Sequence, residues 1–410
     1  MTTRSSPPPL PTLNLPRSAP TTASIVFGLL KRLRHGTLDV QLPDGNLVHA
    51  GTHAPGEPRA VVCLHNWNVC AAALRSGDIG FAETYIAGDW TTPDLPSLLA
   101  LFVANRDEID HVVYGTWWGS LLHRLRHLLN RNSRSGSRRN IHSHYDLGND
   151  FYRLWLDPTM NYSSAWFDGD RTQSLPSAQQ AKLRRALSQA GVRPGDRVLE
   201  LGCGWGALAE CAARDFGANV TGVTLSVEQL DWARRRLAAA GLSADLRFED
   251  YRDIEGGPFD AVVSIEMFEA VGHRYWPAFF AALHKQLKPG ARACIQTITI
   301  RDDLWGRYLR STDFIQQYIF PGGLLPSAPE FRKACGRAGL EVTDEFDFGL
   351  DYAETLRRWR ARFTVEGARI RQLNFDTRFM RTWDFYLAYC EAAFAMRNTS
   401  VVQFTLQRPA

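Results

Sequence analysis

The sequence predicts an α/β protein whose larger part is a doubly wound parallel sheet, preceded by a smaller α+β domain. Two observations support this prediction. An apolar run at residues 198–201 ends in a turn with three glycines, and residues 207–214 after it have helical composition. Strand, tight turn and helix in this order form half of a nucleotide fold. The chain also has 410 residues, more than one average domain, so two packed units are expected.

The glycine turn indicates a ligand site. Gly202, Gly204 and Gly206 read G-x-G-x-G, which differs from the G-x-G-x-x-G of dinucleotide-binding proteins. Glycines let a ligand approach backbone N–H groups at the start of a helix, where the helix dipole favours an anionic group. With the acidic Glu200 at the end of the strand, the pattern resembles motif I of S-adenosylmethionine (SAM) methyltransferases. On the turn alone, a purely structural role stays open.

Composition narrows the class of protein. Hydrophobic residues make up 45% of the chain and charged residues 22%, so a sizeable core is expected. The seven cysteines show neither a C-x-x-C pair nor a metal-ligand spacing with histidine, which predicts reduced thiols, no metal site and a cytoplasmic protein. Cys203, inside the glycine turn, is predicted to be a small filler. No segment is apolar over the roughly 18 residues of a transmembrane helix, so any membrane contact would be peripheral.

The first part of the chain predicts a tail and a small domain. Residues 1–22 are rich in proline and carry no periodicity, which predicts a disordered tail. The domain is assigned to residues 23–135. Its expected elements are a helix from Ser24, a hairpin over residues 37–46 with its turn at Pro43–Asn46, a strand over residues 59–65 and a helix over residues 67–85.

A basic amphipathic helix is predicted at the end of this domain, over residues 117–130. Leucine and tryptophan occupy one face, histidine and arginine the other, and four arginines follow at 131, 134, 138 and 139. Two interpretations stay open. The helix docks on the core with a solvated charged face, or it binds anionic phospholipid, where each basic residue contributes about 1 kcal/mol. No aromatic-interleaved basic groove supports nucleic acid as a partner.

Three motifs together indicate one specific family. They are residues 144–150 (His-Tyr-Asp-Leu-Gly-Asn-Asp), residues 157–163 (Asp-Pro-Thr-Met-Asn-Tyr-Ser) and residues 202–206 (Gly-Cys-Gly-Trp-Gly). Together they resemble the cyclopropane-fatty-acyl-phospholipid synthase and mycolic acid cyclopropane synthase family. The resemblance is strong from about residue 140 to the C-terminus, and covers the N-terminal part only in placement and general character. It implies a Rossmann-like SAM-dependent methyltransferase domain, assigned to residues 136–410.

The resemblance also implies a cofactor site. Thr224 and Gln229 follow the next predicted strand, where a nucleotide fold contacts the ribose and methionine portions of its ligand. Asp250 and Tyr251 fall where the family contacts adenine. The residues predicted to bind SAM are Tyr162, Ser163, Glu200, Gly202, Gly204, Thr224, Gln229, Asp250 and Tyr251.

The proton-accepting site departs from the family pattern. In the family the acceptor is a bicarbonate ion held by a cysteine, a glutamate, a histidine, a backbone group beside an isoleucine, and a tyrosine. Glu269, Ile298 and Tyr352 keep three of these positions, whereas Ser164 stands in place of the cysteine and Gln296 in place of the histidine. Serine and glutamine still donate hydrogen bonds to an anion, so bicarbonate binding stays open. These five residues are the predicted catalytic set, although Glu269 also fits a buried structural carboxylate.

Two C-terminal segments complete the expected domain. Residues 304–325 are rich in apolar and aromatic side chains and are predicted to cover an acyl chain, with an ordinary core helix pair as the alternative. Residues 382–396 predict a helix, and residues 400–406 a strand that closes the sheet. The resemblance to methyltransferases implies that this strand forms a final antiparallel hairpin edge.

The predicted reaction follows from the chemistry of SAM and alkenes. Methyl transfer to a double bond produces a carbocation, which must be shielded from water before it loses a proton. We therefore expect methylation of unsaturated acyl chains in membrane phospholipids, giving cyclopropane fatty acids. If the base is displaced, a hydride shift gives a methylene or methyl-branched chain instead, because placement of the base decides between them.

Partners and alternatives follow from the same expectations. The expected partners are the acyl chains and an anionic surface at the inner face of the membrane, and the oligomeric state is left open between monomer and homodimer. Two other functions stay open: a methyltransferase for a soluble small molecule, and a noncatalytic lipid-binding protein that keeps the fold. The apolar segment at residues 304–325 and the basic helix disfavour the first. Retention of the glycine turn disfavours the second.

Overall fold

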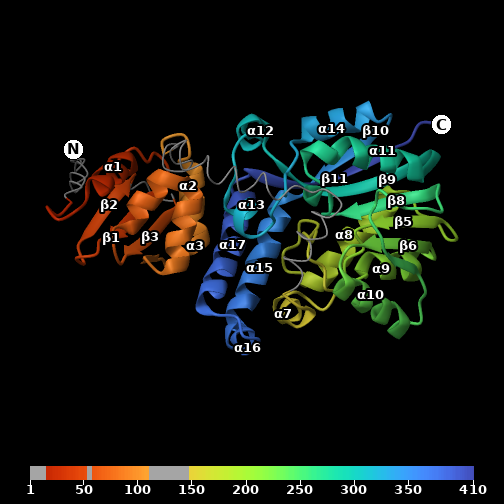
Figure 1. The fold of residues 1–410 in the computed structure, drawn as a ribbon, viewed down its shortest axis with the longest axis horizontal. Coiled ribbons are helices and arrows are strands. Elements are labelled where there is room, and N and C mark those ends of the chain that lie inside the picture. The colour runs from red at the N-terminus through yellow and green to blue at the C-terminus, as the bar shows by residue number, and fades with distance from the viewer. Residues whose placement is uncertain (1–14, 53–57, 110–146) are drawn as a thin grey trace, which may run out of the picture. The chain divides into compact units, whose positions relative to one another are not determined.

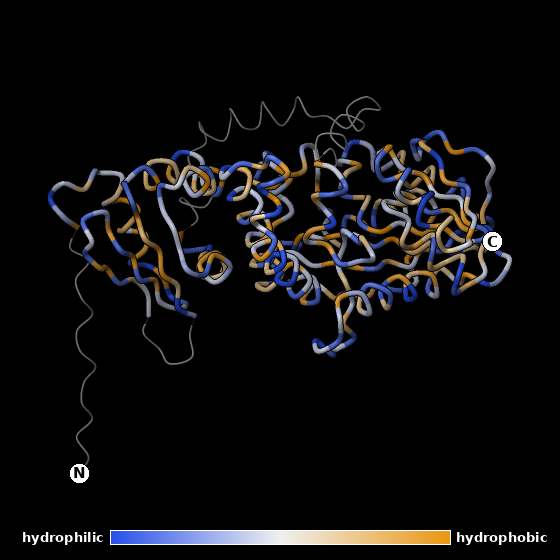
Figure 2. Tube along the Cα trace, turned by 90° about the horizontal axis from the view of Figure 1, so that it is seen from below, coloured by the Kyte–Doolittle hydropathy of each residue, from blue (hydrophilic) through white to orange (hydrophobic). Residues whose placement is uncertain are grey.

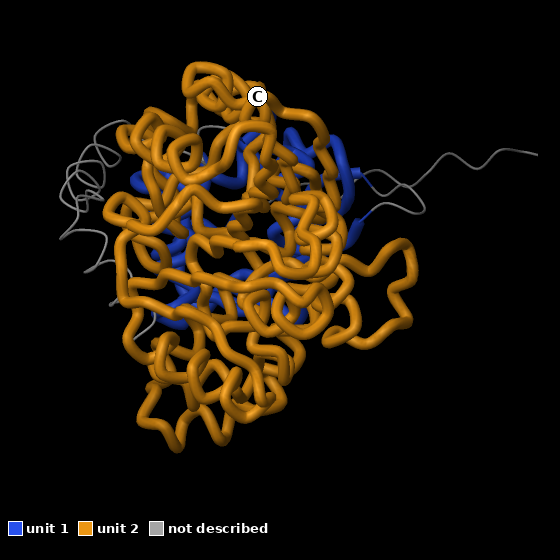
Figure 3. The backbone as a smooth tube through the Cα atoms, turned by 90° about the vertical axis from the view of Figure 1, so that its right-hand side faces the viewer, with its two compact units in different colours: residues 1–122 blue, residues 123–410 orange. Residues whose placement is uncertain are grey.

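The computed structural model describes residues 15–52, 58–109 and 147–410 (Figure 1). The chain divides into two compact units, residues 1–122 and residues 123–410 (Figure 3). Both this division and the predicted boundary after residue 135 lie outside the described residues. The predicted amphipathic helix and the arginines after it lie there too, so their role stays a prediction.

The N-terminal unit contains a four-stranded sheet and three described helices. Its elements are α1 (Thr21–Leu30), β1 (Thr37–Gln41), β2 (Leu47–Gly51), β3 (Arg59–Leu64), α2 (Asn68–Ala87), β4 (Trp90–Thr91) and α3 (Leu95–Ala104). The predicted hairpin is confirmed, because β1 pairs antiparallel with β2, and β1 also pairs parallel with β3. The strand order is β2-β1-β3-β4. Helix α1 begins at Thr21, directly after the extended Pro20, and so takes in the last two residues of the predicted tail.

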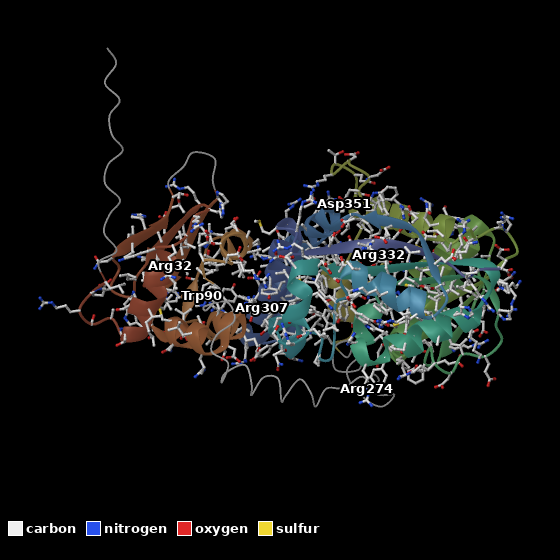
Figure 4. The ribbon with its side chains drawn as sticks, turned by 90° about the horizontal axis from the view of Figure 1, so that it is seen from above. Arg32, Trp90, Arg274, Arg307, Arg332 and Asp351 are labelled. Atoms are coloured by element: carbon white, nitrogen blue, oxygen red, sulfur yellow. The ribbon has the colours of Figure 1, made fainter. Side chains whose placement is uncertain are left out.

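Trp90 anchors the core of this unit and is labelled in Figure 4. Its side chain is fully buried, and its indole N–H donates to the hydroxyl of Thr84, at 3.1 Å. Its ring stacks on Phe81 of α2, with 4.3 Å between centroids. A buried indole needs such a hydrogen-bond acceptor, so this contact ties the short strand β4 to α2.

The C-terminal unit is built on a seven-stranded sheet. Its first elements are α7 (Asn149–Trp155), α8 (Leu175–Gln189), β5 (Arg197–Leu201), α9 (Ala207–Phe216), β6 (Asn219–Thr224), α10 (Val227–Ala239), β7 (Asp245–Phe248), β8 (Phe259–Ile265), η1 (Phe268–Ala270), η2 (His273–Tyr275) and α11 (Trp276–Gln286). The later elements are β9 (Leu287–Ile300), α12 (Asp302–Tyr308), α13 (Phe314–Tyr318), α14 (Ala328–Arg337), β10 (Glu341–Asp347), α15 (Gly349–Val365), α16 (Gly367–Gln372), α17 (Thr377–Ala395) and β11 (Thr399–Gln407).

The strand order is β10-β11-β9-β8-β5-β6-β7. Strands β5 to β9 run parallel, whereas β11 is antiparallel to both of its neighbours, β9 and β10. The C-terminal strand is therefore confirmed as β11, but it lies between β9 and β10, and β10 forms the sheet edge. The reason is that β10 pairs along the free side of β11.

Both faces of this sheet are covered, which confirms the doubly wound fold. Helices α8, α9 and α10 pack on one face, with Leu187 in that core, and α11 and α14 pack on the other, with Phe279 in that core. Successive residues of β5 alternate between the two cores, since Val198 belongs to the first and Leu199 to the second. Strands buried on both faces read as continuous apolar runs. Figure 2 shows hydrophobic stretches of the chain running through this unit.

An aromatic core joins α7 to the long helices α15 and α17. The ring of Trp155 on α7 lies 5.7 Å from that of Trp359 on α15 and 5.8 Å from that of Trp383 on α17. The segment predicted as an acyl-chain cover packs on neighbouring helices: Trp305 of α12 stacks on Trp276 of α11, with 5.6 Å between centroids. Within the described ranges, no helix combines the length and apolarity needed to cross a membrane.

Candidate active site

A pocket opens at the carboxyl ends of the parallel strands, and the glycine turn after β5 forms one wall. The chain continues from β5 to β6 and β7 on one side of β5, and then crosses to β8 on the other side. An open α/β sheet binds its ligand at the point where the strand order reverses in this way, which here lies between β5 and β8. Gly202 and Gly206 have φ angles of +82° and +81°, in the region that favours glycine. A Cβ atom on Gly206 would lie 2.8 Å from the Cβ of Ala233 on α10. The turn therefore requires glycine for both conformation and close approach.

Most residues predicted to bind SAM line this pocket. They are Tyr162, Ser163, Glu200, Gly202, Gly204, Thr224, Gln229 and Tyr251. Asp250 does not line it, because its buried carboxylate is held by the guanidinium of Arg252, at 2.7 and 2.6 Å. Its neighbours Glu249 and Tyr251 face the pocket instead. Asp250 therefore shapes the loop that carries them.

Glu200 provides a fit test for the predicted cofactor. Its side chain is buried, and its Oε2 atom has no hydrogen-bond partner among the described residues. Burial raises the pKa of Glu200 to about 8. A buried carboxylate oxygen without a partner is rare, and it fits a ligand that brings a donor, such as the ammonium or hydroxyl groups of SAM. The pocket residues thus fit the predicted cofactor.

Cys203 in the glycine turn is a buried filler, as its position predicts. Only 3% of the residue is exposed, and burial raises the pKa of its thiol well above the ordinary value. A Cβ atom on Gly222 of β6 would lie 3.0 Å from the Cβ of Cys203. The small side chain therefore suits the close approach of the turn to β6.

Three of the predicted catalytic residues converge on Glu266, a carboxylate that the sequence analysis did not select. The backbone N–H of Ser164 and the side-chain amide of Gln296 both donate to its Oε1, each at 2.8 Å. The hydroxyl of Tyr352 donates to its Oε2, also at 2.8 Å. The resemblance assigns these three positions to a bound bicarbonate. A carboxylate of the chain itself accepts their hydrogen bonds here.

The backbone of Glu266 is strained. It follows β8 directly and has a φ of +49°, in the left-handed region. A residue other than glycine held there costs about 1–3 kcal/mol, and such strain clusters at functional sites. Glu266 also lines the cofactor pocket. An acidic side chain at the carboxyl end of a central strand is the signal that could have identified it from the sequence.

Glu269 and Ile298 lie beside this site but contact each other. The Oε1 of Glu269 accepts a hydrogen bond from the backbone N–H of Ile298, at 2.5 Å. Its Oε2 has no hydrogen-bond partner in the described part of the chain. Burial and the nearby charge of Glu266 raise the pKa of Glu269 to about 8. Two neighbouring carboxyl groups disfavour double ionisation, and the raised pKa of Glu269 favours its neutral form.

Lys182 of α8 is a second residue that the sequence analysis did not select. It is fully buried, and its Nζ donates to the hydroxyl of Ser163, at 2.5 Å. Burial lowers the pKa of Lys182 to about 8, against the attraction of Glu266 and other acidic groups. Burial raises the pKa of Glu266, and the charge of Lys182 opposes that rise. The arrangement can therefore keep Glu266 ionised beside the cofactor pocket.

Known proteins resemble this chain in both sequence and structure. The family model described as mycolic acid cyclopropane synthetase matches residues 132–404. A tuberculostearic acid methyltransferase of Mycobacterium tuberculosis is 40% identical over 404 residues, which are 95% of this chain and 92% of the relative. A cyclopropane-fatty-acyl-phospholipid synthase of Escherichia coli is 33% identical over 381 residues, covering 90% of this chain and 96% of the relative.

Solved structures of the same family also resemble this chain. A mycolic acid cyclopropane synthase in complex with SAH and CTAB is 33% identical with a TM-score of 0.62, covering 66% of this chain and 98% of that chain. A cyclopropane synthase from Mycobacterium tuberculosis is 31% identical with a TM-score of 0.61 and the same coverage.

Proposed function

Because the chain belongs to the mycolic acid cyclopropane synthetase family and is a methyltransferase that uses SAM, we propose that it methylates the double bond of unsaturated acyl chains in membrane phospholipids. Two relatives that span at least 90% of the chain carry names that specify fatty-acid or phospholipid acyl methylation. Aromatic side chains beside the pocket support an apolar acceptor. The ring of Phe320 lies 6.4 Å from the ring of Tyr162, which lines the pocket. A phospholipid acceptor would place the enzyme peripherally on the membrane.

In this proposal the predicted SAM-binding residues and the predicted catalytic residues have separate roles. Bound SAM supplies an activated methyl group. The pocket residues predicted to bind SAM would hold it, and the Glu200 carboxylate would accept a hydrogen bond from it, whereas Asp250 shapes the loop. Glu266 accepts the proton that the methylated chain must lose, and Ser164, Gln296 and Tyr352 hold its carboxylate in place. The buried setting excludes water from the carbocation.

For the product, we propose a methylene-bearing chain, and the Glu266 carboxylate is the observation that carries this choice. Its Oε1 already accepts two hydrogen bonds and its Oε2 one, which leaves a single lone pair in a fixed direction. Three donors also stabilise the charged form and weaken the base. Slower proton removal gives a hydride time to shift onto the neighbouring carbon.

The hydride shift moves the cation to the methyl-bearing carbon. Loss of a proton from the new methyl group to Glu266 then leaves an exocyclic methylene. Prompt loss of the same proton, before the shift, would close a cyclopropane. The relative named as a tuberculostearic acid methyltransferase supports the hydride shift over direct closure of a cyclopropane. A methyl branch would need a separate reduction step.

The test is mass spectrometry with alkene mapping. Purified protein is incubated with SAM carrying a fully deuterated methyl group and with vesicles of monounsaturated anionic phospholipid. Two deuterons on a surviving, exocyclic alkene are expected. Two deuterons on a chain that has lost its alkene would establish the cyclopropane and overturn the proposed product. Unchanged lipid under conditions where SAM binds would overturn the acceptor and favour a soluble one.

A further inference from the structure

Gln296 can support the Glu266 carboxylate in only one orientation of its amide group. Its Nε2 atom donates to Glu266 Oε1 at 2.8 Å. Turned by half a rotation, the amide would present its oxygen to the carboxylate, which replaces a hydrogen bond by a repulsion. The two orientations have nearly the same shape, so packing alone does not choose between them. Some other group must fix the direction.

Gln403 lies directly opposite Gln296 in the antiparallel pairing of β11 with β9. Both side chains are fully buried. The Nε2 of Gln403 donates to Gln296 Oε1 at 3.0 Å and to the backbone carbonyl of Lys182 at 3.2 Å. Its Oε1 accepts from the guanidinium of Arg185 at 2.7 Å. Gln403 thus connects Gln296 to two groups whose hydrogen-bonding roles cannot change.

These fixed roles determine the orientation of both the Gln403 and the Gln296 amide. A guanidinium only donates and a backbone carbonyl only accepts, so the Gln403 oxygen must face Arg185 and its nitrogen must face Lys182 and Gln296. That nitrogen requires the oxygen of Gln296, which turns the Gln296 nitrogen toward Glu266. Arg185 is itself held, by Asp344 at 3.2 Å and by the ring of Phe346, 3.7 Å from its guanidinium carbon.

We propose that Arg185 and Gln403 are positioning residues for the proton-accepting site, which hold the Gln296 amide with its donor toward Glu266. The inference rests on the proposed role of Glu266 as the base. The charged and titratable groups that act on Glu266 are Lys182 from α8, Tyr352 from α15 and Glu269 from η1. The experiment below leaves all three unchanged.

The decisive variant is Gln403→Glu. The new carboxylate keeps the contact with Arg185 but has no donor for Gln296, so the Gln296 amide reverses and its oxygen faces Glu266. The pKa of Glu266 then rises, because a supporting donor becomes an opposing acceptor. We expect the acid limb of the kcat profile to move up by about one pH unit and kcat at pH 7 to fall by roughly two- to fivefold, because Glu266 starts out mostly ionised, with KM for SAM nearly unchanged.

Matched variants separate positioning from general damage. Gln407→Glu makes the same change at the last residue of β11, where the amide donates to the carbonyl of Gly290, and should leave the profile unchanged. In a Gln296→Met background there is no amide to reverse, so Gln403→Glu should add only the smaller shift caused by its own charge. If Gln403→Glu does not fold, Arg185→Met should shift the profile in the same direction by a smaller amount.

A second readout works without turnover. Carbon-13 NMR of labelled glutamate, assigned by comparison with Glu266→Gln, follows the titration of Glu266 directly. A higher midpoint in Gln403→Glu is expected even if the acceptor lipid proves to be wrong, so failure of the proposed function is distinguishable. An unchanged midpoint and pH profile, or an equal shift in the Gln296→Met background, would overturn the positioning role.

Discussion

The two halves of the pocket are built in different ways. The cofactor half depends on the backbone of one turn, where Gly202 and Gly206 adopt conformations that favour glycine. The proton-accepting half depends on side chains from separate segments, which meet at Glu266. A backbone site changes only if the fold changes, whereas a side-chain site can change its chemistry at one position. If Glu266 is the base, as we propose, this difference explains how the family fold accommodates it.

The halves also differ in charge. The accepting half contains the fully buried Lys182 close to the partly buried Glu266 and Glu269. Buried charges are costly unless they are paired and hydrogen-bonded. Lys182 supplies a positive charge near Glu266, and three hydrogen-bond donors contact the carboxylate oxygens of Glu266. We therefore expect variants of this half to change rates and pH profiles, and variants of the other half to change SAM binding and stability.

The largest effect is expected for Glu266→Gln, which breaks the accepting half alone. Loss of a general base lowers kcat by about 10²- to 10⁴-fold, while the shape of the side chain is kept, so SAM affinity should stay within about threefold. Steady-state kinetics and calorimetry measure the two quantities. Glu345→Gln is the control, since that carboxylate pairs with the surface Arg332, labelled in Figure 4, at 2.8 Å. Equal activity of the two variants would refute the role of Glu266.

Gly206→Ala tests the cofactor half. The positive φ angle and the 2.8 Å approach to Ala233 both oppose a Cβ atom. We expect the free energy of unfolding to fall by about 2–4 kcal/mol, and SAM binding to weaken. Gly195→Ala is a matched control, because its φ is +86° but nothing lies within 4 Å of the added atom. It should lose only about 1–2 kcal/mol in urea unfolding. Equal losses would show that the close approach contributes nothing.

Lys182→Met should shift pH dependence in both activity and stability. The folded-state pKa of Lys182, about 8, lies below its ordinary 10.5, so the folded protein binds fewer protons than the unfolded chain between these values. Stability from this group therefore rises with pH between about 8 and 10.5, and the variant should lose that rise. The acid limb of kcat should move to higher pH, because the charge that favours ionised Glu266 is gone.

Urea unfolding of both proteins at pH 8 and pH 10 measures the stability change. The matched comparison is the difference between wild type and Lys182→Met at each pH, which cancels the groups they share. A difference that does not depend on pH would contradict the assignment of a lowered pKa to this lysine.

The smallest effect is expected for Trp205→Phe. The indole N–H of Trp205 donates to Asn149 of α7 at 2.7 Å, and its ring packs near Tyr152, with 5.1 Å between centroids. Phenylalanine keeps the packing and removes one hydrogen bond, so unfolding should cost about 0.5–1.5 kcal/mol less. Thermal unfolding measures this loss of stability. Trp232→Phe, the same substitution on α10, is the control. A loss above about 3 kcal/mol would mean that the indole does more than join the turn to α7.

The contrast between a local backbone turn and side chains from distant segments also decides how much could be predicted from the sequence. The glycine turn, its strand and its helix are local patterns, so the cofactor half and the doubly wound sheet were predictable. The partners of Glu266 lie 102, 30 and 86 residues away in the chain, and no local pattern brings them together. Asp250 shows a second limit of local patterns. Its position fits the adenine contact, but the neighbouring Arg252 takes its carboxylate.

Dependence on bicarbonate tests the central claim most directly. The wild-type protein and Glu266→Gly are assayed in carbon-dioxide-free buffer, with and without added bicarbonate. Glycine suits the φ of +49° at this position and leaves the three donors without their carboxylate. We predict that the wild-type rate does not respond to bicarbonate, whereas Glu266→Gly is inactive without it and recovers activity with it. A wild-type rate that collapses without bicarbonate would contradict the claim that Glu266 is the base.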